Sequence, residues 1–168
     1  MRNLHSMILI GIACFAMTAC HKTLSEEDSA AKQRSADFQA AILSHKYKLV
    51  SFYADKPIDY ITNDSEVKSE TDLWPYVKLH IIDDQYFFGA NGALTIHQMT
   101  DKMGGNDSQT INASYGLTVK GADVVMKFVD YMYSSLDYKL HEFDNAYFTV
   151  YVDGPSGSKL YSKYALVE

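Results

Sequence analysis

The sequence predicts an all-β fold, an antiparallel up-and-down β-barrel of eight strands that follows a short helix. Three observations lead to this fold. Beyond Lys46 the hydrophobic residues recur with a period of two, as in strands with one buried face. Clusters of Asp, Asn, Gly and Ser separate these runs at short intervals, and short links force neighbouring strands to be antiparallel. A meander of such strands has two open edges, and closure into a barrel removes both.

Nine runs alternate as strands do, and turn signals such as Asn91-Gly92 and Asp144-Asn145 lie between them. Two longer stretches, 54–75 and 99–113, are polar and are predicted to be loops. A two-sheet sandwich is the alternative fold, but the consecutive hairpins give no sign of the crossings that it needs. The predicted strands are 46–53, 76–82, 85–88, 93–98, 114–119, 124–129, 137–142, 146–152 and 160–167.

Residues 1–19 have the features of a secretory signal peptide. Arg2 lies in a short polar start, the apolar run 7–17 follows, and small residues lead to Cys20. The run is shorter than the roughly 20 residues that cross a bilayer as a helix. Met17-Thr18-Ala19-Cys20 resembles the lipobox of bacterial lipoproteins. That resemblance implies cleavage before Cys20 and attachment of palmitate and other acyl chains to this residue.

The cysteine count supports a lipid anchor by a separate route. The chain has two cysteines, Cys14 and Cys20, so the cleaved form keeps one thiol and has no intramolecular disulfide. An acylated sulfur is protected in an oxidising compartment. By the same resemblance, His21 after the anchor implies the outer membrane. The acidic cluster 25–28 fits either a surface-export signal or a solvated tether, so a periplasmic and a surface-facing position both stay open.

Residues 20–45 are predicted to be a lipid-anchored tether that contains the short helix. From Ser25 to about Ser44 there is no Gly or Pro, and Ala31, Phe38 and Ile42 recur at helical spacing. Ser25 can cap the helix, and the acidic residues after it suit the first turn. The apolar stripe is narrow, which favours a spacer that rests against the domain over a membrane-binding helix.

Residues 46–168 are the predicted barrel domain, and part of it resembles a known family. The segment 79–96 is similar to a hairpin of small lipocalin-like bacterial lipoproteins that reads Asp-Asp-x-Tyr/Phe-x-Phe-x-x-Asp/Asn-Gly-x-Leu-Thr. Tyr47-Lys48-Leu49-Val50-Ser51 resembles the first strand of that family, and the hairpins from Leu136 to Val167 resemble its closing pairs. The resemblance implies a lipocalin-like barrel; it carries no catalytic signature.

Several kinds of chemistry are not expected. The formal charge is −6 and no basic stripe exists, which excludes nucleic acid as a partner. Alternation places His80, His97 and His141 on polar faces, so no metal site is predicted. The segment 154–159 lacks the spacing of a phosphate loop, and no nucleophile elbow or zinc-protease motif occurs. We therefore expect no cofactor and no enzymatic activity.

The inside of the barrel is the remaining candidate site. The first hypothesis is a binding module of the cell envelope that holds a small or apolar ligand there. The alternative is a solid barrel that contacts another envelope protein, since large aromatic side chains favour filling. Outward-facing Phe87, Tyr147 and Tyr151 offer a surface for a glycan or a protein. The predicted lining residues are Trp74, Tyr86, Phe88, Tyr115, Phe128, Phe148 and Tyr164.

Overall fold

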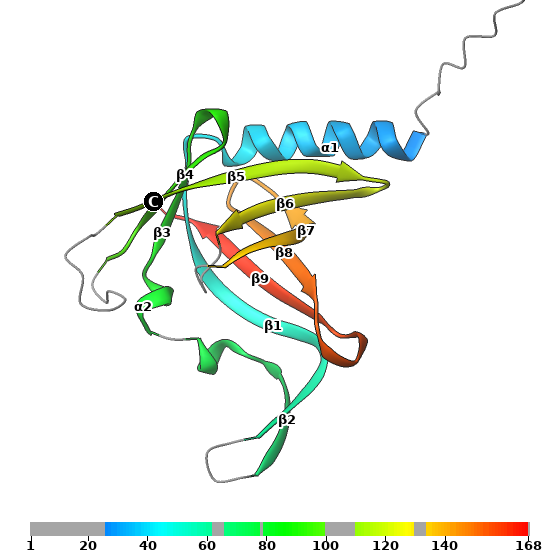
Figure 1. The fold of residues 1–168 in the computed structure, drawn as a ribbon, viewed down its shortest axis with the longest axis vertical. Coiled ribbons are helices and arrows are strands. Elements are labelled where there is room, and N and C mark those ends of the chain that lie inside the picture. The colour runs from blue at the N-terminus through cyan, green and yellow to red at the C-terminus, as the bar shows by residue number, and fades with distance from the viewer. Residues whose placement is uncertain (1–25, 62–65, 78, 100–109, 130–133, 168) are drawn as a thin grey trace, which may run out of the picture.

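The computed structural model describes residues 26–61, 66–77, 79–99, 110–129 and 134–167 (Figure 1). Eight strands form one closed antiparallel β-barrel, which confirms the predicted fold class. The proposed signal peptide and Cys20 lie outside the described residues. The barrel strands are β1 (Lys46–Ile61), β3 (Gln85–Phe88), β4 (Ala93–His97), β5 (Thr110–Lys120), β6 (Asp123–Val129), β7 (Ser135–Phe143), β8 (Tyr147–Asp153) and β9 (Lys159–Leu166).

Strand β1 closes the barrel because it pairs on both sides. Its start pairs with β3, where Tyr47 lies opposite Tyr86, and its first half pairs with β9 from Tyr47 to Ala54. The register shifts between Leu49 and Ser51, and a similar shift interrupts the pairing of β7 with β8. Such bulges bend and twist a strand, which closure of a small barrel requires.

The helix α1 (Glu26–Ile42) matches the predicted helix and lies across one end of the barrel (Figure 1). Phe38 and Ile42, four residues apart, are fully buried in the barrel core. Ser44 ends the helix with a left-handed φ of 63°, and its N–H donates to the Phe88 carbonyl at 2.8 Å. The helix is therefore part of the core packing and closes the barrel at this end.

The predicted strand 76–82 and the predicted loop 54–75 were wrong. Segment 76–82 contains the end of a 3-10 turn, η1 (Trp74–Tyr76), and the short helix α2 (Leu79–Ile82) instead of a strand. Val77 and Ile81 are both buried, but Val77 has an extended backbone and lies outside the helix, so an irregular segment buries the apolar residues that a strand was expected to bury. The predicted loop 54–75 contains the second half of β1 and the strand β2 (Val67–Asp72). Strand β2 is mostly exposed and so lacks apolar alternation.

The core lies where alternation predicted it. Tyr86, Phe88, Leu94 and Ile96 from β3 and β4 are at most 1% exposed, while the residues between them are half-buried. The link between β3 and β4 is the predicted Asn91-Gly92 turn, in which Asn91 has φ 58° and Gly92 has φ 76°. Within the described residues, neither helix has the length and apolar character needed to cross a membrane.

Candidate functional site

The structure brings the predicted lining residues together, and their rings fill the barrel. Five of the seven side chains are 0% exposed, and Tyr115 is 7% exposed. Trp74 lies on η1, where it is half-buried and packs against the core. The five fully buried residues are Tyr86, Phe88, Phe128, Phe148 and Tyr164.

These rings contact one another across the barrel interior. Phe148 stacks on Tyr164 with ring centroids 4.9 Å apart and planes at 14°. Phe128 meets Tyr164 edge-on at 5.8 Å, and Phe88 lies 5.2 Å from Tyr115 and 5.8 Å from Phe148. Edge-to-face and offset pairs of this kind are favourable beyond the burial of their surface. The predicted binding residues therefore serve as each other's packing partners.

The helix α1 adds further contacts to this network at the end of the barrel that it covers. The Phe38 ring lies 5.2 Å from Phe143 and 5.5 Å from Phe148. The Tyr47 hydroxyl donates to the Ala41 carbonyl at 3.2 Å, and the Arg34 guanidinium donates to the His141 carbonyl at the β7 bulge. The described helix thus occupies the mouth through which a ligand would enter from this side.

The outer face of β1, β9 and β8 carries a second set of rings, the tyrosine ladder of Tyr53, Tyr161 and Tyr151. These residues lie opposite one another in the sheet register. Tyr53 and Tyr161 stack at 5.0 Å and 7°, and Tyr151 lies 5.4 Å from Tyr161. His141 meets Tyr161 edge-on at 5.0 Å, and the Lys159 ammonium lies 4.7 Å above Tyr151. Because each ring covers its neighbour, Tyr161 is only 8% exposed.

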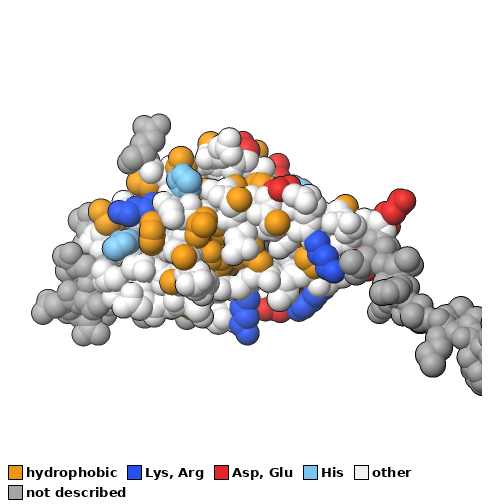
Figure 2. Space-filling model, turned by 90° about the horizontal axis from the view of Figure 1, so that it is seen from above, with side chains coloured by type: hydrophobic (Ala, Val, Ile, Leu, Met, Phe, Trp, Pro, Cys, Tyr) orange, Lys and Arg blue, Asp and Glu red, His pale blue; other side chains and the backbone are white. Residues whose placement is uncertain are grey.

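Of the outward aromatic residues that the sequence identified, Phe87, Tyr147 and Tyr151 are all half-buried. The Lys163 ammonium lies 3.6 Å from the centre of the Tyr147 ring, a cation–π contact within the same face. Sequence reasoning missed Tyr53 and Tyr161. The outward position of Tyr161 follows from alternation with Tyr164, whereas Tyr53 points outward because of the register shift between Leu49 and Ser51, which the sequence does not reveal. Seen from above in Figure 2, hydrophobic side chains form small groups among polar and charged ones.

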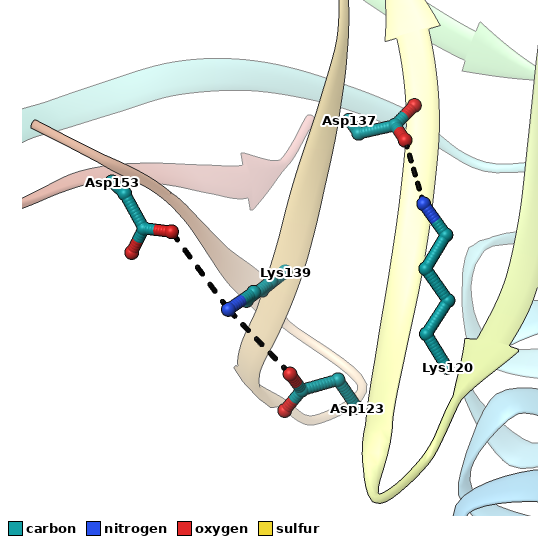
Figure 3. A network of polar contacts seen from close by, with 5 residues as sticks. All are labelled: Lys120, Asp123, Asp137, Lys139 and Asp153. Atoms are coloured by element: carbon teal, nitrogen blue, oxygen red, sulfur yellow. Dashed lines mark hydrogen bonds and ion pairs between the residues drawn. The ribbon is translucent and has the colours of Figure 1, made fainter.

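A shallow groove of about 450 Å³ lies on the outside of β5, β6 and β7. Gly116 leaves open space at its floor, since a Cβ there would meet nothing within 4 Å. Across the groove, the Lys120 ammonium forms an ion pair with the Asp137 carboxylate at 2.9 Å (Figure 3). The nearby Lys139 ammonium lies 3.6 Å from the Asp123 carboxylate and 3.8 Å from the Asp153 carboxylate. The groove is lined by Ser114, Tyr115, Gly116, Thr118, Lys120, Lys127, Ser135 and Asp137.

Where the pKa of a titratable group shifts clearly, it shifts away from neutral pH. Burial raises the pKa of Tyr47, Tyr53 and Tyr115. The hydrogen bond from Lys120 lowers the pKa of the Asp137 carboxyl, and the Asp153 carboxylate raises the pKa of Lys139. General acid–base catalysis favours groups whose pKa lies near the working pH, and these shifts go in the opposite direction.

Four of the six histidines lie within the described residues. His45 and His141 are exposed, His97 is half-buried at the end of β4, and His80 belongs to α2 rather than to a strand. Within the described residues, no group of three or more His, Cys, Asp or Glu side chains could hold a metal ion.

No protein-family model matches the chain, and no curated protein matches it. A solved structure of a redesigned beta barrel aligns with 77% of this chain and 95% of its own chain, at 13% sequence identity and a TM-score of 0.35. At this level of similarity, nothing about ligands or partners transfers from that protein.

Proposed function

We propose that this protein is a non-enzymatic module of the cell envelope, anchored by lipid at Cys20, whose solid barrel acts through its outer surface. The observation that carries the proposal is the interior packing, because the side chains expected to bind a ligand are buried against one another. Protein interiors pack this densely unless a cavity is maintained for a ligand. The pKa shifts away from neutrality and the absence of catalytic motifs in the sequence support a non-enzymatic role.

The barrel architecture and the resemblance of segment 79–96 support a place among small lipocalin-like bacterial lipoproteins. The lipobox-like Met17-Thr18-Ala19-Cys20 supports the anchor, and His21 supports the outer membrane. Two or more acyl chains suffice for stable attachment to a bilayer. A small apolar ligand inside the barrel stays a prediction, and native mass spectrometry of the protein tests it.

Native mass spectrometry of the full chain, extracted from its envelope, tests the interior. We expect the native protein to carry no bound small molecule and to take up no added benzene or indole. Phe128→Ala should create an apolar cavity of about the volume of the lost ring. This cavity should bind the added probes, because apolar cavities of that size take up benzene. Leu94→Ala is a milder second variant in case the first does not fold. A stoichiometric small molecule on the native protein would contradict the solid-barrel proposal.

A pair of cysteine variants tests the anchor separately. Cys20→Ser should lose incorporation of labelled palmitate and leave the membrane fraction. Cys14→Ser is the matched control, because Cys14 lies within the apolar run and would be removed with the signal peptide. Labelling that survives in Cys20→Ser, or is lost in Cys14→Ser, would refute lipidation at Cys20.

A further inference from the structure

A two-stranded ribbon projects from the barrel and pairs with nothing else that the structure describes. It consists of the end of β1 (58–61) and the facing part of β2 (67–70), with Ile58 opposite Glu70 and Asp59 opposite Ser69. Figure 1 shows it extending below the barrel. Pairing between β1 and β9 ends at Ala54, and β2 pairs with β1 alone among the described strands.

Such a ribbon is unusual in isolation. Two strands without a third strand or a packed face are only marginally stable in water, and an unpaired edge is a template for another strand. The side chains of β2 are largely exposed, and Val67 is 70% exposed. The base of the ribbon is well held, because the Lys159 N–H donates to Asp55 at 2.7 Å and the Lys56 ammonium donates to the Gly157 carbonyl. These two bonds tie the β1 side of the ribbon to the turn before β9, and the outer edge of β2 has no strand partner among the described residues.

The sequence of β2 is complementary to itself when two copies run antiparallel. With Ser69 opposite Ser69 of the second copy, Lys68 faces Glu70 and Val67 faces Thr71, each pair occurring twice by symmetry. Opposite charges and β-branched residues are the cross-strand pairs that stabilise sheets. Asp72, the last residue of β2, would lie opposite Glu66 of the second copy, and this like-charge contact limits the pairing to the five residues 67–71. A parallel arrangement in the same register would instead place Lys68 opposite Lys68.

We propose that the free edge of β2 binds β2 of a second copy of this chain, antiparallel about a twofold axis at Ser69. The pairing joins two barrels edge to edge through backbone hydrogen bonds, with the charge order of β2 selecting its own copy as the partner. It goes beyond the proposed function, and the contact itself involves neither the lipid anchor nor the barrel interior, although an anchor would raise the local concentration of the copies. A strand pair of this length is small beside the about 1,600 Å² of standard interfaces, so we expect weak association in solution and more on a membrane that concentrates the copies.

Cysteine cross-linking of the full chain in a bacterial envelope tests the pairing. In Ser69→Cys, two cysteines on the twofold axis fall within the Cα separations that disulfides allow. Mild oxidation should yield a band of twice the chain mass. The parent chain corrects for Cys14 and Cys20, and Ser114→Cys, an exposed residue on β5, should stay monomeric.

Charge variants in the Ser69→Cys background test the register. Lys68→Glu places Glu opposite Glu, and Glu70→Lys places Lys opposite Lys, so each should weaken association by about tenfold. Lys68→Glu adds negative charge beside the thiol introduced at position 69, and Glu70→Lys adds positive charge, so the two changes affect the reactivity of that thiol in opposite directions. A loss of cross-linking in both variants therefore reports on pairing. Lys68→Glu with Glu70→Lys restores opposite pairs and should restore cross-linking. Tyr76→Phe controls for the 3.0 Å hydrogen bond that Glu70 accepts from Tyr76.

Three results would overturn the proposal. The first is a Ser69→Cys chain that forms no dimer above the parent. The second is a dimer that the charge variants leave unchanged, which would place the contact elsewhere. The third is a cross-linked band of another mass, which would identify a different protein as the strand donor.

Discussion

The barrel and the ribbon share one strand, and they differ in what the side chains of that strand contact. In the first half of β1, Tyr47 and Leu49 are 1% exposed, and the backbone pairs on both sides. In the second half, the strand continues as a strand, but it pairs only with β2, and most described side chains there are exposed. Backbone pairing is therefore enough to shape a strand, whereas burial of alternate side chains decides whether the strand belongs to a core.

Hydrogen exchange should separate the two regions most widely. Amides in the core strands open only with global unfolding, while an exposed ribbon opens locally. In Lys68→Glu, which disfavours pairing between copies, we expect the amides of 67–70 to exchange about a thousandfold faster than those of β8. Mass spectrometry of peptic peptides measures both segments in one experiment. Equal protection would show that the ribbon is part of the cooperative core.

Removal of one interior ring should have the largest effect on stability. Phe148 contacts Phe38, Tyr47, Phe88 and Tyr164. Phe148→Ala should lower the free energy of unfolding by about 3–5 kcal/mol in a denaturant titration. Tyr151→Ala, outward-facing on the same strand, is the control, and we expect a cost of about 1 kcal/mol. Similar costs for the two variants would contradict the contrast between inner and outer rings.

Loss of the helix anchor should come next. Phe38→Ala removes the only fully buried aromatic side chain of α1, and we expect a loss of about 3 kcal/mol together with faster proteolysis within the helix. Gln33→Ala, which removes an exposed hydrogen bond to Asp37, is the matched control on the same helix and should change little. A helix that stays protected in Phe38→Ala would show that other contacts hold it.

The buried tyrosines should make the barrel sensitive to alkali. Burial raises the pKa of Tyr47 in the folded state, so the unfolded chain ionises first, near pH 10. Stability is then full below about pH 10 and falls as the pH rises above that value. Tyr47→Phe should cost about 1 kcal/mol at pH 8 through the lost hydrogen bond to Ala41 and should flatten the decline in stability above about pH 10. An unchanged alkaline slope would exclude Tyr47 as a source of the decline.

The surface ion pairs should have the smallest effect. Asp137→Asn breaks the bond to Lys120, but both side chains are largely exposed, and solvent screens such pairs. We expect the same unfolding midpoint as the native protein, measured at pH 7 in low salt. A clear loss of stability would show that the groove on β5 to β7 is more rigid than its exposure indicates.

The barrel could be predicted from the sequence because its signal is strong and repeated. Core strands such as β3 and β4 bury a large apolar residue at every second position, as at Tyr86 and Phe88, and turn residues such as Asn91-Gly92 fix the links. The ribbon could not be predicted, because charged residues and Pro57 interrupt any alternation where neither face is buried. Segment 76–82 was ambiguous, since its apolar residues Val77 and Ile81 are buried without forming a strand, one on extended backbone and one on a short helix.

Six of the seven predicted lining residues are buried in the barrel core, but the sequence did not decide whether they line a cavity or pack on one another. Alternation points Phe128 and Tyr164 inward without fixing the orientation of their rings. Whether such rings surround a space or meet at 5.8 Å depends on rotamers and on what closes the ends. The helix residue Phe38 shows this best, because it was expected on a spacer and instead contacts Phe143 and Phe148 in the core.

The pairing of Tyr47 with Leu166 also governs when the protein can fold. This contact joins nearly opposite ends of the barrel sequence, so the ring of strands cannot close until the last strand is present. Contacts between residues so distant in the chain also form slowly. A chain that has not yet closed its barrel must therefore hold a row of unjoined strands, and in that state it is most exposed to aggregation and to the proteins that guard against it.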